Sequence, residues 1–292
     1  MSARRLLVTG AGGMLGHDVL RAAQRAGREA EGLARAELDI TDAAAIEQTL
    51  ERLRPQAIVN CAAWTDVDGA QEHRAAARAV NAQGAGKLAR AAGAAGIPLV
   101  HVSSDYVFDG EAPRDAGGEP RPYVESDPTA PRSVYGQTKL EGELAVLDAS
   151  PGHAVARSSW LFGVGGPNFA ATMIRLAGER EAVQVVTDQV GSPTWTGHLA
   201  PALLGLLERE VSGLVHLAGS GHVSWHDFAV EIFHQAELDC RVEPATSDQL
   251  ARPAPRPAWS ALASERGDVL AMPDWREGLA GYLAARAGIM RA

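Results

Sequence analysis

A tyrosine and a lysine lie four residues apart near the middle of the chain, at Tyr135 and Lys139. Among 27 basic side chains, only one other, Lys87, is a lysine. An arginine does not replace the compact ammonium of lysine where the charge must respond to its surroundings. The spacing places both side chains on one face of a helix, where the cation can lower the pKa of the phenol and favour proton donation. The simpler alternative is an exposed Tyr/Lys pair on an amphipathic helix.

Glycines near the N-terminus have the spacing of a dinucleotide-binding turn. Gly10, Gly13 and Gly16 follow an apolar run at 6–8 and precede a helical pattern. The first glycine permits a tight turn, the second lets backbone N–H groups approach a pyrophosphate, and the third lets helix and strand pack closely. Because the required strand and helix are both indicated, we predict a bound dinucleotide rather than an unliganded turn. The predicted cofactor-binding residues here also include Met14 and Leu15.

The position that usually selects between NADH and NADPH carries no carboxylate. About 20 residues after the turn, where an acidic side chain would hold the ribose 2′-hydroxyl, the chain has Arg35. A guanidinium can bind a 2′-phosphate, so the sequence favours NADPH. NADH is the alternative, because the carboxylate of Glu37 is close in the sequence. We expect Asp39 and Ile40 to lie at the adenine.

The first half of the sequence supplies the elements that must position these groups. Short apolar runs alternate with helical patterns, as in a parallel sheet covered by helices. On the helix that carries Tyr135, we expect Leu140, Leu144 and Leu147 to point inward. The expected strands are 6–8, 29–33, 57–60, 99–103 and 154–157, the last closing the sheet, and the other expected helices are 14–26, 41–53 and 75–95.

After about residue 160, loops rich in Gly and Pro separate shorter elements. We therefore predict an α/β fold with a doubly wound, Rossmann-type parallel sheet and a smaller C-terminal substrate-binding lobe. Residues 1–160 form the NADP-binding domain and 161–292 form the lobe, with room for the chain to cross back to the sheet.

The composition narrows the classes of partner. Hydrophobic residues at 46% and charged residues at 22% are typical of a globular protein. A net charge of −9 without a basic stripe argues against nucleic acid. Two cysteines are too few for a disulfide framework or a zinc cluster, and no apolar stretch approaches membrane-spanning length. We expect a cytoplasmic protein with no membrane partner.

Ser104 adds a third polar group, at the end of the fourth expected strand, where such sheets place ligand-contacting side chains. Its hydroxyl can hydrogen-bond a carbonyl oxygen as charge develops there. Ser, Tyr and Lys in this order resemble the ketone-reducing centre of the extended short-chain dehydrogenase/reductase family. Within it, the chain resembles the dTDP-4-dehydrorhamnose reductase family along nearly its whole length. The similar segments are 60–68 (NCAAWTDVD), 104–110 (SDYVFDG), 135–143 (YGQTKLEGE), 157–160 (RSSW), 188–194 (DQVGSPT) and 273–277 (PDWRE).

This resemblance implies NADPH-dependent reduction of the 4-keto group of a dTDP-linked 6-deoxyhexose, giving dTDP-L-rhamnose or a close relative. It implies that Tyr135 donates the proton, that Lys139 binds the ribose and lowers the phenol pKa, and that Ser104 polarises the carbonyl. It also implies that Trp160 faces the sugar and that Arg256 reaches the diphosphate. The remaining implied residues are Cys61, Ala62 and Ala63 at the cofactor, and Asp105, Tyr106, Asn168 and Gln189 at the substrate.

Two positions depart from the family pattern. The family usually has Thr where this chain has Ser104, and it commonly reads RPxNS where residues 256–260 read RPAWS. The second departure leaves the contacts of the nucleotide and the identity of the sugar open. Some family members use magnesium at a dimer contact. No carboxylate cluster in this sequence requires it, so no metal-ligating residues are predicted and the use of Mg²⁺ is left open; a homodimer is one option.

Two rival functions share these features. A non-catalytic NADP-binding subunit, similar to the regulatory β subunit of methionine adenosyltransferase, would need no turnover, and the intact Ser104, Tyr135 and Lys139 argue against it. A nucleotide-sugar epimerase or dehydratase would recycle its nicotinamide. Asp105 has no Glu after it, which favours simple reduction. Trp225 is expected to pack within the lobe rather than contact the cofactor.

Overall fold

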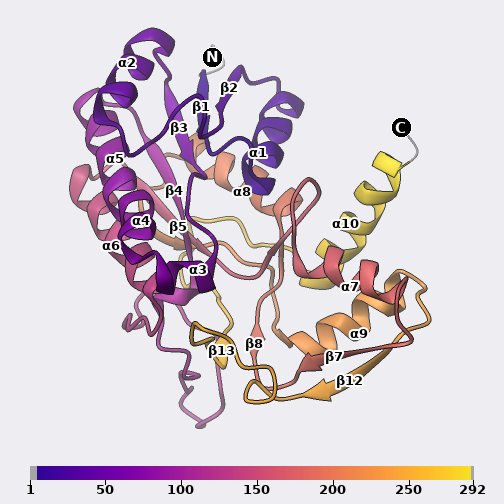
Figure 1. Cartoon of the computed structure of the whole chain (residues 1–292). Helices are drawn as coiled ribbons and strands as arrows, with labels where there is room; N and C mark the ends of the chain where they lie inside the picture. The colour runs from indigo at the N-terminus through magenta and orange to yellow at the C-terminus, as the bar shows by residue number, and fades with distance from the viewer. Residues whose placement is uncertain (1–4, 291–292) are drawn as a thin grey trace.

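Six parallel strands form the centre of the molecule, in the order β10-β5-β4-β3-β1-β2 (Figure 1). The computed structural model describes residues 5–290 of the chain. Because the strands are parallel, the carboxyl ends of β1, β3 and β4 meet at one edge of the sheet, where ligands bind in folds of this class. The strands are β1 (Leu6–Thr9), β2 (Ala30–Leu33), β3 (Ala57–Asn60), β4 (Leu99–Ser104), β5 (Ala154–Ser158) and β10 (Gly213–His216).

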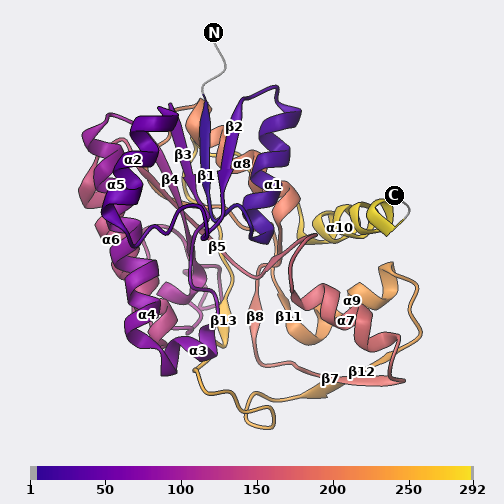
Figure 2. The same cartoon turned by 45° about the horizontal axis from the view of Figure 1, so that its top comes forward.

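Helices cover both faces of this sheet. α1 (Met14–Arg25) and α8 (Thr196–Glu208) lie on one face, and α2 (Ala43–Leu53), α5 (Ala85–Ala94) and α6 (Val134–Ala149) lie on the other (Figure 2). Along β1, Leu6 and Val8 pack into the α1/α8 layer, and Leu7 packs into the α2/α5 layer. All four residues of β1 are buried, as expected where a parallel sheet is covered on both sides. The predicted doubly wound α/β fold is confirmed.

The expectation that the strand at 154–157 closes the sheet is wrong. β10 pairs with the outer edge of β5, so that Leu214 lies beside Val155. The sequence placed residues 213–216 in the smaller lobe because they lie far beyond residue 160. An unpaired β5 edge would leave backbone hydrogen-bonding groups without partners, and β10 satisfies them.

The helix expected at 75–95 is present, but it is not α-helical throughout. It runs continuously through α4 (Arg74–Arg78), a π-helical segment at Ala79–Gly84 and α5. The short helix α3 (Val67–Glu72) precedes it. Within the π-helical segment, the Asn81 amide bonds the backbone of Trp64 and the hydroxyl of Thr138. Alanine spacing predicts helical content but carries no signal for these contacts, which change the helical register.

α6 buries a different face from the one expected. Leu144 is 61% exposed and Leu140 and Leu147 are only partly buried. The inward face instead carries Lys139 and Glu143, both almost completely buried. The apolar pattern was misleading because the interior against which α6 packs contains charged partners.

The smaller lobe lies at the carboxyl end of the sheet (Figures 1 and 2). It has an apolar core around Phe162, Phe228, Trp275 and Tyr282. Its helices are α7 (Phe169–Ala177), α9 (Trp225–Gln235) and α10 (Trp275–Met290). Two of its sheets have two strands each: β7 (Ala182–Val186) pairs with β12 (Arg241–Ala245), and β6 (Leu161–Phe162) pairs with β9 (Thr194–Trp195). In the third sheet, β8 (Val190–Gly191) lies between β11 (Val223–Ser224) and β13 (Trp259–Ser260).

Candidate active site

The glycine turn brings backbone close to backbone. Gly10 has a φ of +69°, and a Cβ there would lie 2.6 Å from the backbone nitrogen of Ala62. A Cβ on Gly16 would lie 2.4 Å from the carbonyl oxygen of Gly10. Helix α1 begins at Met14 after Gly13, with no side chain capping its first N–H groups. Its free N–H groups and the positive end of its dipole suit a phosphate.

Two cavities meet over this turn. The larger has a volume of about 680 Å³ and extends from the glycine turn to Trp160. The other, of about 360 Å³, extends toward Arg35. Both are lined by Gly10, Gly13 and Cys61, so they form one groove across the carboxyl edge of the sheet. Every residue that we predicted at the cofactor lies in its wall: Gly10, Gly13, Met14, Leu15, Gly16, Arg35, Asp39, Ile40, Cys61, Ala62, Ala63, Tyr135 and Lys139.

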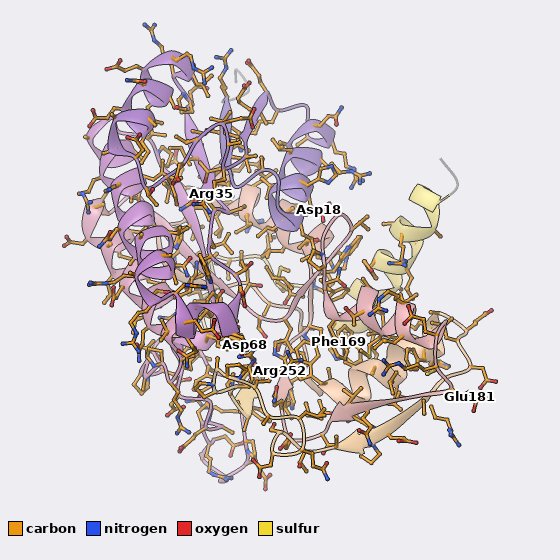
Figure 3. The ribbon with its side chains drawn as sticks, viewed as in Figure 1. Asp18, Arg35, Asp68, Phe169, Glu181 and Arg252 are labelled. Carbon is orange, nitrogen blue, oxygen red and sulfur yellow. The ribbon has the colours of Figure 1, made fainter. Side chains whose placement is uncertain are left out.

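Arg35 lies at the far end of this groove (Figure 3), with its side chain 78% exposed. Its Nε is 3.7 Å from Oδ2 of Asp39, whose other oxygen accepts hydrogen bonds from Thr41. These hydrogen bonds lower the pKa of Asp39. Glu37 accepts a hydrogen bond from the backbone N–H of Ala34. Arg35 is therefore the cationic group facing this end of the groove.

Ser104, Tyr135 and Lys139 lie together in the wall of the larger cavity. β4 ends at Ser104, and α6 begins at Val134 and presents the other two from one face. The Ser104 hydroxyl donates to Oδ1 of Asp105 at 2.8 Å and accepts from the Tyr106 N–H at 3.2 Å. The Lys139 ammonium donates to the carbonyl oxygen of Val102 at 2.7 Å.

Burial controls the proton affinities of this group. It raises the pKa of Tyr135 to about 12, against a hydrogen bond between Tyr135 and Ser104 that lowers it. It lowers the pKa of Lys139 to about 8, against the charge of Glu143. The net shift of the phenol pKa is upward because desolvation of the buried ring is its largest cause, and the lowering by Lys139 stays a prediction. Tyr135 consequently keeps its proton near neutral pH.

Asp105 and Tyr106 continue the wall of the larger cavity. Burial raises the pKa of Asp105 to about 6, opposed by hydrogen bonds from Ser104 and Ser260. Burial likewise raises the pKa of the Tyr106 phenol, whose ring meets that of Tyr135 edge-on at 5.4 Å.

Two tryptophans form the lobe side of the cavity. Trp160 stacks on Trp225 with ring centroids 3.4 Å apart, and its Nε1 donates to the Ser260 hydroxyl at 3.1 Å. Trp225 packs within the lobe, as expected, and also lines the cavity. No local pattern indicates the second role, since Trp160 and Trp225 meet only through the tertiary fold.

The structure does not bring Asn168 and Gln189 into the cavity wall. The Asn168 amide donates to the carbonyls of Gly163 and Gly166, and its oxygen caps α7. The Gln189 amide donates to the hydroxyl of Ser247. Both side chains hold loops of the lobe.

Arg256 lines a smaller cavity of about 180 Å³, which shares Tyr106 with the large one. Arg256 pairs with Asp68 of α3 at 2.8 Å, and Arg252 lies 3.7 Å from the same carboxylate. Figure 3 shows Asp68 and Arg252 side by side. Asp68 thus joins the sheet domain to loop 251–258 of the lobe. Sequence reasoning missed Asp68, and also Arg132, which lines the same small cavity.

Across residues 5–290, no group of three or more His, Cys, Asp or Glu side chains is placed to hold a metal ion.

Comparison with known families gives a match along most of the chain. Residues 4–287 match the family model described as the RmlD substrate binding domain. The chain belongs to this family. The predicted resemblance is therefore confirmed.

Several relatives of this RmlD-family chain have names that describe reductases. It is 46% identical over 289 residues to "dTDP-4-dehydrorhamnose reductase" of Mycobacterium tuberculosis, covering 97% of this chain and 93% of the relative. It is 42% identical over 286 residues to a "probable dTDP-4,6-dihydroxy-2-methyloxan-3-one 4-ketoreductase" of Streptomyces antibioticus, covering 94% and 93%. Among solved structures, the dTDP-4-dehydrorhamnose reductase of Bacillus anthracis in complex with NADP superimposes with a TM-score of 0.91 at 35% identity, covering 97% of this chain and 99% of the other.

Proposed function

We propose that this protein is an NADPH-dependent reductase that converts the 4-keto group of a dTDP-4-dehydro-6-deoxyhexose to a hydroxyl, giving dTDP-L-rhamnose or a close relative. The observation that carries the proposal is the grouping of Ser104, Tyr135 and Lys139 in one cavity next to the glycine turn. The names of the M. tuberculosis and B. anthracis relatives support the same reaction. The name of the S. antibioticus relative describes a related keto sugar, so the preferred sugar is the finer question.

The groove fits a dinucleotide cofactor. A phosphate would rest on the uncapped N-terminus of α1, where Gly10 and Gly13 keep the approach clear of side chains. Arg35 would meet the 2′-phosphate of NADPH, with NADH as the weaker alternative. Asp39 and Ile40 would border the adenine, and residues 61–63 would line the middle of the groove.

When bound, the nicotinamide cofactor supplies the hydride. Tyr135 then donates its phenolic proton to the carbonyl oxygen, which its high pKa allows because the phenol is protonated at working pH. Lys139 has three N–H donors and uses one on the carbonyl of Val102, so two remain for ribose hydroxyls. The single proton of the Ser104 hydroxyl points to Asp105 and must turn toward the substrate oxygen to polarise it.

The tryptophan side of the cavity would receive the sugar. Trp160 with its partner Trp225 offers an apolar wall, and Asp105 and Tyr106 offer the facing polar wall. Arg256 would meet the diphosphate from the neighbouring small cavity. We propose that Asn168 and Gln189 act on the substrate only indirectly, by holding the loops around it.

The same proposal covers organisation and place. We propose a cofactor domain up to about residue 160 and a substrate lobe after it, with α8 and β10 returning to the sheet. In the part of the chain that the structure describes, no helix is long and apolar enough to cross a membrane. We propose a cytoplasmic enzyme that acts on a nucleotide sugar and not on nucleic acid, with a homodimer as one option.

The decisive experiment is incubation with dTDP-4-dehydro-L-rhamnose and NADPH, followed by product analysis. Tyr135→Phe should lower turnover by about 10²- to 10⁴-fold, because it removes the proton donor, while NADPH affinity stays the same. Tyr282→Phe is the matched control, because Tyr282 is a buried tyrosine in the lobe core. Full activity of Tyr135→Phe would reject the assignment. NADPH binding without consumption by the unaltered protein would favour a regulatory subunit, and product formation without net NADPH loss would favour an epimerase or dehydratase.

A further inference from the structure

The inward face of α6 carries a buried carboxylate, that of Glu143, which the proposed reaction does not explain. Lys139 and Glu143 lie one turn apart and are 2% and 1% exposed. Glu143 meets Arg157 of β5, which is 3% exposed. Three charged side chains are thus enclosed between α6 and the sheet, where an uncompensated charge would be costly.

The Glu143–Arg157 pair is complete in its geometry. Arg157 Nε donates to Oε1 of Glu143 at 2.9 Å, and Nη2 donates to Oε2 at 2.7 Å. These two parallel hydrogen bonds fix the carboxylate in position. The guanidinium also lies over the ring of Phe108, with its central carbon 5.0 Å from the ring centroid.

His216 closes the other side of Arg157 without adding a charge. Its Nδ1 faces the carbonyl oxygens of Ala263 at 2.9 Å and Tyr123 at 3.2 Å, so Nδ1 carries the hydrogen. Nε2 is then the acceptor that faces Arg157 Nη1 at 3.5 Å. Burial lowers the pKa of His216, which keeps the ring neutral.

The groups that surround Lys139 leave Glu143 as the source of negative charge. On α6 itself, Tyr135 and Glu143 face Lys139; β3 is followed by Cys61, and β4 contributes His101 and the carbonyl of Val102. Burial raises the pKa of Cys61 to about 12 and lowers that of His101, so both are neutral at pH 7. Of the titratable groups acting on Lys139 within residues 5–290, Glu143 is the anion.

We propose that Glu143, held in place by Arg157, is a positioning residue that keeps the ammonium of Lys139 charged inside the cavity. The use of that ammonium, to hold the cofactor ribose beside Tyr135, rests on the proposed function, whereas the coupling of charges does not. Buried ion pairs can often be replaced by apolar side chains without loss of stability, so stability alone does not account for this pair. Its position one turn after Lys139 does account for it.

The small number of lysines allows a direct test. The chain has two, Lys87 and Lys139, so protein carrying ¹³C at lysine Cε gives two lysine resonances to follow by NMR as the pH changes. Lys87→Arg assigns them. In wild type, Lys139 should titrate near pH 8. Glu143→Gln removes the attraction that favours the charged form, so Lys139 should titrate about one pH unit lower while Lys87 stays unchanged.

Matched variants separate charge from structure. Glu141→Gln makes the same change on the exposed side of α6 and should leave the Lys139 titration as in wild type. Glu143→Gln leaves Arg157 buried and unpaired, so it should also lower the melting temperature. The double variant Glu143→Met/Arg157→Met removes both charges; it should recover most of the melting temperature but retain the lowered Lys139 titration.

Kinetics supply a second reading. The alkaline fall in kcat/KM should move to lower pH in the double variant, because Lys139 loses its charge sooner as the pH rises. A double variant in which Lys139 titrates as in wild type would overturn the proposal and leave the pair a purely structural one. Absence of reductase activity in wild type would instead overturn the proposed function, and the NMR titration would still decide the coupling.

Discussion

The two ends of the groove are built in different ways. At the cofactor end, the walls come from short stretches after β1, β2 and β3, and backbone lies close to backbone, as at Gly10 and Ala62. At the substrate end, the walls come from segments far apart in the chain, joined by pairs such as Asp68–Arg256 and Trp160–Trp225. The first end tolerates little variation in shape. The second can change its contacts while the sheet stays the same, which suits relatives whose names describe different keto sugars.

The largest expected effect is at the cofactor end. Gly10→Ala places a methyl group 2.6 Å from the backbone of Ala62 on a residue with φ +69°. The backbone at either position can move only at a high energetic cost, so the turn that would bind the pyrophosphate should be distorted. NADPH affinity should therefore fall by at least about 100-fold, measured by fluorescence titration.

Gly27→Ala separates the effect of the positive φ from the effect of the close backbone contact. Gly27 has a φ of +66°, and a Cβ there meets nothing within 4 Å. Gly27→Ala should lower the free energy of unfolding by only about 1–2 kcal/mol, because alanine disfavours a positive φ, and should leave NADPH affinity unchanged. An equal loss of affinity in both variants would mean that close backbone contact does not define this end.

The substrate end should respond more moderately. Asp68→Asn releases Arg256 and loop 251–258 from α3, so KM for the dTDP sugar should rise about tenfold while KM for NADPH stays constant. Arg252→Ala removes the longer, 66% exposed contact to the same carboxylate and should change KM less than about threefold. If Asp68→Asn raised both KM values together, the two ends would not be separable.

The smallest effect should come from Arg35, which is highly exposed and forms an ion pair with Asp39. Arg35→Ala should raise KM for NADPH about fivefold, because it removes a cation that meets the 2′-phosphate. KM for NADH, which lacks that phosphate, serves as the internal control. A parallel rise in both would show that Arg35 acts on the adenine end without selecting the phosphate.

This contrast also explains what the sequence could predict. The glycine spacing, the serine at the end of β4 and the Tyr135/Lys139 pair are local patterns, and the structure places all of them in one groove. Trp225 and Asp68 carry no local signal, because their partners lie at distant positions. Asn168 and Gln189 came from resemblance alone, and their amides bond loop groups instead.

Helix α6 shows a second limit of sequence patterns. Leucines spaced at 140, 144 and 147 indicated the inward face, yet that face carries Lys139 and Glu143. The pairing of Glu143 with Arg157, and so the burial of both, depends on how α6 lies against β5. Apolar periodicity describes a helix as though all its neighbours were apolar, and here one of them, Arg157, is charged.

The return of the chain to the sheet has a consequence for engineering. β10 and α8 come from the second half of the sequence but complete the sheet and its α1-side layer. A chimaera joined once near residue 160 would therefore exchange part of the nucleotide-binding scaffold along with the sugar pocket. To transfer sugar preference between relatives, two separate segments should be exchanged, one on each side of residues 196–216. Residues 196–216 should come from the same protein as the rest of the sheet.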